Sequence, residues 1–138
     1  MCLELPDGTT QTIAPADLAT LPQAQVEDCY IVSTGHGASG PFRFSGVRLA
    51  DFLHAYVPAG LAWSAVDVIS GDGFGNRIYA QELTHNRAPT SRAILLATQV
   101  DGEPLARAAG LVRLIVPSET EDALRQVKWV ARIVVHDV

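Results

Sequence analysis

Three turn signals, each set between β-rich runs, constrain the fold of this chain more than any other feature. Asp7-Gly8 and Asp101-Gly102 are dipeptides that favour tight hairpin turns, and "GDGFGN" at 71–76 supplies three glycines that can adopt positive φ. The runs beside them, such as "AVDVIS" at 65–70 and "AILLATQV" at 93–100, are rich in apolar and β-branched residues. The pattern predicts a series of hairpins rather than a doubly wound parallel sheet.

Short helices and further strands are expected between these hairpins. Pro15–Leu18 is predicted to form a short helix, because proline is tolerated in a first turn. The apolar spacing of "VRLADFLHAY" at 47–56 predicts a second helix lying on the core. Strands are expected in "VEDCYIVS" at 26–33 and "GLVRLIVP" at 110–117. This mixture favours an α+β fold in a single domain that spans residues 1–138.

The last run, "VKWVARIVVHDV" at 127–138, is expected to be one long strand. Strand alternation would place Val127, Trp129 and Ala131 on one face, opposite Lys128, Val130 and Arg132. The apolar positions that we expect to be largely buried are Leu49, Phe52, Leu53, Leu95, Leu114, Val116 and Val130.

Composition excludes several classes of protein. A net charge of −5, with scattered lysines and arginines, argues against a nucleic-acid-binding surface. No apolar run approaches the roughly 18–20 residues that a membrane span needs. Glu4 and Asp7 interrupt the opening apolar residues, so a cytoplasmic location is expected, or an exported one if a signal was removed before the numbering. The two cysteines, Cys2 and Cys29, match no zinc pattern and are expected to be free thiols.

The loop "VSTGHGASGPFR" at 32–43 is the most suggestive segment. Its three glycines could turn backbone N–H groups towards an anion, with His36 and Arg43 close by in sequence. It matches neither the P-loop nor the dinucleotide-binding glycine pattern, so a plain connection with a solvated arginine is the alternative. Asp72 is expected to bond its own turn, and Lys128 is either an edge charge or a pocket residue. The sequence contains no recognisable nucleophile arrangement and no helical histidine pair, so it predicts no catalytic or metal-ligating residues.

The order of segments resembles the molybdopterin-binding domain of the sulfite oxidase family. "FSGVRLADFL" resembles that family's "W-x-G-V-P-L-x-D-L-L", and "GDGFGN" is similar to its "DGY" segment. "ILLATQVDGEPLARAAGLVRLIVP" resembles "LLA…NGEPL…G-x-P-x-R-L-V-V-P", and "VKWVARIVV" resembles "VKW…RIEV". The resemblance covers nearly the whole chain. It implies the α+β fold of that domain, in a stand-alone short member of the family.

Two departures from the family pattern bear on function. The resemblance implies a molybdenum held by a pterin dithiolene and one cysteine thiolate, but the cysteine position falls on Thr34. A neutral hydroxyl does not replace a thiolate, and the alternation of the strand turns Cys29 to the other face. A family tyrosine near the metal aligns with Phe74, which has no hydroxyl. Lys128 and Trp129, in contrast, match the lysine and tryptophan of the family's "VKW".

The resemblance and its departures together favour a non-catalytic protein with no cofactor, which binds a small anion, a pterin-like ligand or a protein partner. The candidate ligand-binding residues are Thr34, His36, Arg43, Asp72, Arg77 and Lys128. One alternative is a molybdopterin-dependent oxidoreductase with an atypical metal ligand. Another is a protein-interaction module without a small-molecule site.

Overall fold

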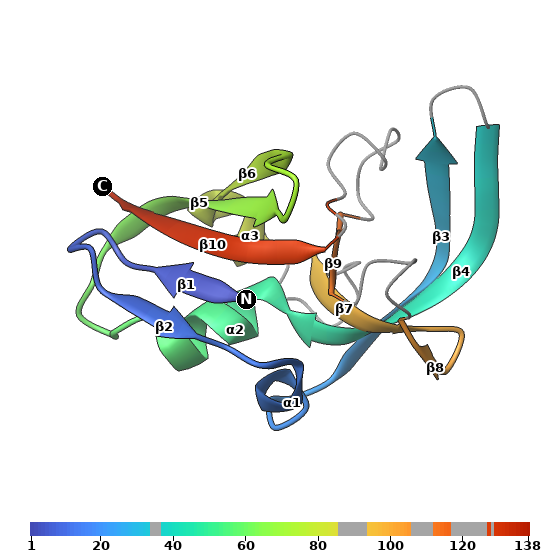
Figure 1. The fold of residues 1–138 in the computed structure, drawn as a ribbon, viewed down its shortest axis with the longest axis horizontal. Helices are drawn as coiled ribbons and strands as arrows, with labels where there is room; N and C mark the ends of the chain where they lie inside the picture. The colour runs from blue at the N-terminus through green and yellow to red at the C-terminus, as the bar shows by residue number, and fades with distance from the viewer. Residues whose placement is uncertain (34–36, 86–93, 106–111, 117–126, 128) are drawn as a thin grey trace.

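The computed structural model describes residues 1–33, 37–85, 94–105, 112–116, 127 and 129–138. For residues 27–33, 37–41, 84 and 85 it describes the backbone alone. Within these residues the chain forms two β-sheets and three short helices (Figure 1). The molecule is therefore mostly β-structure with a few short helices, which agrees with the predicted α+β class.

The first sheet holds both ends of the described chain. Its strand order is β2-β1-β10-β5-β6, and the neighbours β1 and β10 run parallel while the other pairs are antiparallel. Figure 1 shows β10 crossing the middle of this sheet. The strands are β1 (Cys2–Glu4), β2 (Thr10–Thr12), β5 (Trp63–Ser70), β6 (Gly75–Tyr79) and β10 (Val130–Asp137).

The second sheet has the order β3-β4-β7-β8, and β9 also pairs with β7. All of its pairs are antiparallel. The long β3–β4 hairpin extends to one side of the molecule, away from the first sheet (Figure 1). The strands are β3 (Ala24–Ser33), β4 (Gly37–Arg48), β7 (Leu95–Val100), β8 (Glu103–Pro104) and β9 (Arg113–Ile115).

The three predicted turns are confirmed. Gly8 joins β1 to β2 with φ of 89°, and Gly73 lies between β5 and β6 with φ of 95°. Asp101 and Gly102 join β7 to β8, both with positive φ. The predicted helix at Pro15–Leu18 is also confirmed as α1. Each of these elements depends on residues that set their own backbone angles, which is why the local sequence was sufficient.

Two apolar clusters hold the structure together. The main core joins the first sheet to the helices α1, α2 (Leu49–Tyr56) and α3 (Ala80–His85) and to side chains of β4, β7 and β9, and a smaller cluster lies on the second sheet. All seven positions predicted to be buried are 6% exposed or less. None of the described helices is long and apolar enough to cross a membrane.

The structure corrects the predicted start of the second helix. Val47 and Arg48 were expected to open it, but they form the end of β4 and pair with Leu96 and Leu95 of β7. The helix begins at Leu49, whose backbone N–H donates to the carbonyl of Ile94 at 2.9 Å. Pairing with β7 therefore prevails over the helical spacing of the apolar side chains.

The predicted continuous strand over 127–138 is also wrong at its start. Val127 is fully buried and pairs with Leu114 through an isolated bridge, whereas Trp129 is 41% exposed, so the two do not share a face. Trp129 has φ of 48°, and β10 begins only at Val130. A register shift between Val130 and Arg132 then changes the alternation again.

Candidate functional site

Three segments from distant parts of the sequence meet at one place, which we call the junction: residues 70–74, residues 112–114, and residues 127, 129 and 130. The backbone N–H of Gly71 donates to the carbonyl of Trp129 at 3.0 Å, and that of Val130 donates to Val112, also at 3.0 Å. The N–H of Leu114 donates to the carbonyl of Val127 at 2.8 Å. The turn that carries Asp72 thus lies against Trp129, and Lys128 lies outside the described residues.

Asp72 is fixed within its own turn. Its Oδ1 accepts a hydrogen bond from the Ser70 hydroxyl and another, at 3.1 Å, from the backbone N–H of Phe74. The bond from Ser70, followed by that from Phe74, holds the pKa of this carboxyl below its usual value. The prediction that Asp72 bonds its own turn is confirmed, and the group is an ionised acceptor at neutral pH.

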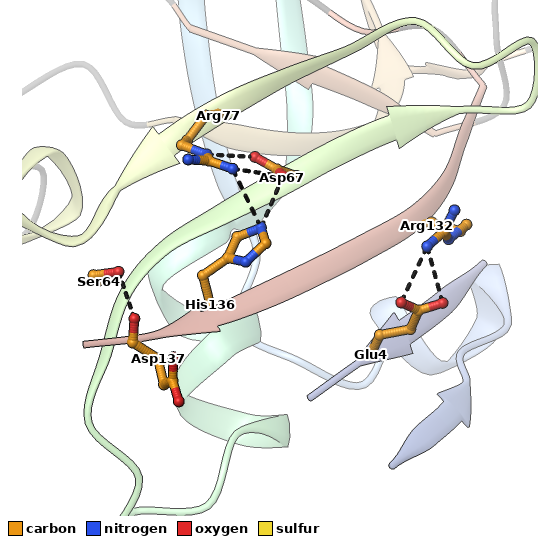
Figure 2. A network of polar contacts seen from close by, with 7 residues as sticks. All are labelled: Glu4, Ser64, Asp67, Arg77, Arg132, His136 and Asp137. Atoms are coloured by element: carbon orange, nitrogen blue, oxygen red, sulfur yellow. Dashed lines mark hydrogen bonds and ion pairs between the residues drawn. The ribbon is translucent and has the colours of Figure 1, made fainter. Parts of the chain in front are cut away.

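Arg77 lies on the outer face of the first sheet and binds a cross-strand partner (Figure 2). Its Nε donates to Oδ1 of Asp67 on β5 at 2.8 Å, and a terminal nitrogen donates to Oδ2 at 3.1 Å. His136 on β10 places Nε2 2.8 Å from the same Oδ2. Arg132 and Glu4 form a second ion pair on this face at 3.0 Å. This surface joins four strands through polar contacts.

The network around Asp67 should make the stability of the protein at acid pH depend on this carboxylate, which Asp67→Asn removes. The hydrogen bond from Arg77, aided by His136, holds the pKa of Asp67 below 3.8. The ionised Asp67 carboxylate contributes fully to stability above that pH. The contribution is lost as the pH falls further, through the lower pKa of Asp67 in the folded state. We expect Asp67→Asn to cost at most about 1 kcal/mol at pH 7, because the pair is partly exposed.

The measurement is urea unfolding of the wild type and Asp67→Asn between pH 2 and 7. The difference between the two proteins should shrink towards zero at the acid end. Asp137→Asn removes an exposed carboxylate from β10, the neighbouring strand that carries His136, and is the matched control. A difference between wild type and Asp67→Asn that stays constant down to pH 2 would contradict the network.

Arg43 belongs to the second sheet. Its backbone N–H donates to Oδ1 of Asp101 at 2.8 Å, and its carbonyl accepts from the N–H of Asp101 at 2.7 Å. Its guanidinium lies over the turn, since a Cβ built on Gly102 would stand 3.4 Å from a terminal nitrogen. Arg43 is thus positioned by the β7–β8 turn.

The predicted set of six site residues is therefore only partly placed. Arg43 and Arg77 lie in different sheets with different partners, and Asp72 lies at the junction. Thr34, His36 and Lys128 lie outside the described residues. The gathering of all six around one ligand stays a prediction.

Arg113 is a candidate that the sequence reasoning missed. It is 5% exposed, in the middle of β9, and burial lowers the pKa of its guanidinium. Its backbone pairs with Ala97 of β7, and the preceding residue, Val112, accepts a bond at the junction. A single arginine inside the apolar run "GLVRLIVP" was the signal, because a buried charge is costly unless a counter-charge is provided.

A comparison with known protein families shows which family the chain is related to. The model of the oxidoreductase molybdopterin-binding domain matches residues 10–138. The chain belongs to this family. The predicted resemblance is confirmed over nearly the whole chain, and no curated protein matches it.

Among the described side chains of this molybdopterin-binding domain, Cys2 is not placed to supply the thiolate that the resemblance implies. Cys2, a free thiol, lies on β1 of the first sheet, whereas position 34 follows β3 of the second sheet in sequence. Among the described residues, no group of three histidine, cysteine or acidic side chains could hold a metal ion. The residue at position 34 itself is a threonine, whose hydroxyl is a poor ligand for a soft metal.

Proposed function

We propose that this molybdopterin-binding domain is a non-catalytic member of its family that binds a small anionic, pterin-like ligand without holding molybdenum through a protein thiolate. The observation that carries the proposal is Thr34 at the position where the resemblance implies the metal-binding cysteine. Cys2 does not substitute for it, because it lies on a strand of the other sheet. Ligand binding in this fold then depends on charge and shape rather than on a metal–sulfur bond.

Arg113 supports an anionic ligand. Its guanidinium is buried on β9, within the junction, where the low dielectric strengthens its attraction to a negative charge. Arginine also offers a planar set of donors that matches carboxylate and phosphate oxygens. Arg113→Met should therefore weaken ligand retention more than Arg113→Lys, which keeps the positive charge.

Two alternatives have an observation in their favour. The family match over residues 10–138 favours a molybdopterin-dependent oxidoreductase with an atypical metal ligand. Phe74 and Tyr79, both about half exposed at the two ends of β6, favour a protein-interaction module.

Metal and pterin contents of the purified protein separate these functions. The full chain is produced in a host that makes the molybdenum cofactor, and molybdenum is measured by elemental analysis, with pterin measured by fluorescence after denaturation. We expect molybdenum far below one atom per chain, together with retained pterin. Thr34→Cys should raise the molybdenum content, because it restores the thiolate. Thr12→Cys adds an exposed thiol on β2 and should leave it unchanged.

Each other result overturns part of the proposal. Near one molybdenum per chain in the protein with Thr34 would favour the oxidoreductase. Absence of both molybdenum and pterin from every variant would favour the interaction module. Equal effects of Thr34→Cys and Thr12→Cys would show that position 34 is not the ligand position.

A further inference from the structure

A cavity of about 440 Å³ lies beside the junction, on the side formed by the N-terminal segment. Its walls include Ile13, Leu18, Val112 and Val130, with Trp129 and Ala131 at the start of β10. None of the six predicted site residues is among the residues that line it in the described part of the chain. It is therefore a feature that the proposed function does not use.

The floor of this cavity is the main core itself. Ile13 and Leu18 are 1% exposed, and Val112 and Val130 are 5% and 6% exposed. The described side chains that line the cavity carry no charge. The amino group of Met1, also at the wall, is a charged ammonium, and it donates to the carbonyl of Ile13 at 2.9 Å. Apolar walls hold water poorly, so an uncharged apolar occupant is the chemistry that fits them.

Trp129 gives the cavity an aromatic wall. Its backbone has φ of 48°, a left-handed conformation that is costly for a bulky residue. Two hydrogen bonds maintain it, one from Gly71 to the carbonyl of Trp129 and one from the next residue, Val130, to Val112. The side chain is 41% exposed, so part of a large apolar surface remains open to contact. Backbone strain that the surrounding structure maintains is concentrated at ligand-binding sites.

We propose that this cavity binds an uncharged, planar aromatic molecule of one or two fused rings, which lies against the indole of Trp129. The volume falls in the lower part of the range for small-molecule sites, about 300–1,000 Å³, and suits a ring system rather than a segment of another protein. Offset stacking of two aromatic rings adds to the free energy gained by burying them. The inference is independent of the anionic ligand, which is assigned to the neighbourhood of Arg113.

The test is a titration of the ¹⁵N-labelled full chain with indole, followed by amide chemical shifts. We expect saturable shifts at Gly71, Val112 and Val130. Ala131→Phe places a ring inside the cavity and should weaken indole binding by at least tenfold. Ala59→Phe, at the wall of a second cavity beside α2, is the matched control and should leave binding unchanged.

A second pair of variants tests the role of Trp129 without risking the fold. Glycine adopts φ of 48° without strain, so Trp129→Gly removes the ring and keeps the backbone path. It should weaken indole binding several-fold, whereas Phe74→Ala, which removes an exposed ring that does not line the cavity, should not.

The outcomes distinguish this inference from the proposed function. Shifts that rise linearly without saturation, or indole binding that survives both Ala131→Phe and Trp129→Gly, overturn the site. Tighter binding of indole-3-acetate than of indole overturns the uncharged ligand class. The pterin content of Ala131→Phe should match that of the wild type, so the two proposals fail separately.

Discussion

Gly46→Ala is expected to lower the free energy of unfolding by about 3 kcal/mol or more, the upper end of what overpacking a core costs. A Cβ on Gly46 would stand 2.1 Å from the carbonyl oxygen of Leu96 and 2.8 Å from the Cα of Ala97. Both atoms belong to the backbone of β7, so no side-chain rotation relieves the clash. The register shift between Ser45 and Gly46 brings the two strands this close.

Urea unfolding followed by circular dichroism measures this effect. Gly60→Ala is the control, because nothing lies within 4 Å of a Cβ at Gly60, and its effect should stay within about 0.5 kcal/mol. A Gly46→Ala protein as stable as the wild type would show that β4 and β7 do not pair in this register. Failure of the variant to fold agrees with the prediction.

Leu114→Ala should cost about 2–5 kcal/mol, the usual range for truncating a fully buried leucine. Leu114 is 0% exposed in the main core, and its backbone pairs with Val127 and with Leu96. The truncation leaves a cavity that the strands on both sides cannot readily fill.

The same unfolding experiment measures the loss, with Val138→Ala as the control. Val138 is 90% exposed, so truncating it should change the free energy of unfolding by no more than about 0.5 kcal/mol. A loss below about 1 kcal/mol for Leu114→Ala would place Leu114 at the surface and contradict the assignment of β9.

The hairpins could be predicted because the information lies within a few residues. Asp7-Gly8 and Asp101-Gly102 set positive φ locally, and the β-rich runs beside them had only to pair with each other. The buried side chains could be predicted equally well, since apolar positions at strand or helix spacing indicate the inner face of an element. Long-range pairing was not accessible. Val47 and Arg48 follow a helical pattern, and only their neighbours on β7 show that they extend β4.

Trp129 illustrates the same limit at a single residue. Alternation in "VKWVARIVV" predicts an ordinary strand position, and no local turn signal marks a left-handed backbone. The conformation depends on hydrogen bonds with Gly71 and Val112, which are remote in the sequence. A period-two pattern carries no trace of such partners.

The candidate site divides in the same way. Asp72 was predicted correctly as a turn residue because its partners, Ser70 and Phe74, are two residues away. Arg77 and Arg43 were predicted to line one site. The structure gives Arg77 a side-chain partner in Asp67 and bonds the backbone of Arg43 to Asp101, and the shared site stays a prediction. Arg113 was overlooked because its burial becomes evident only when β9 is paired with β7.

The position of β10 has a consequence for how the molecule forms during synthesis. This strand follows all the other named strands in the sequence, yet it separates β1 from β5 in the first sheet. Until β10 pairs with them, the β1–β2 and β5–β6 hairpins have no strand that joins them, and their apolar faces remain uncovered. The second sheet pairs β3 with β4 much earlier. We therefore expect the first sheet to assemble after the β3–β4 hairpin and more slowly, because the pairing of β1 with β10 joins segments that are far apart in the sequence. Before β10 pairs, the uncovered strands of the first sheet would be substrates for chaperones that bind exposed apolar segments.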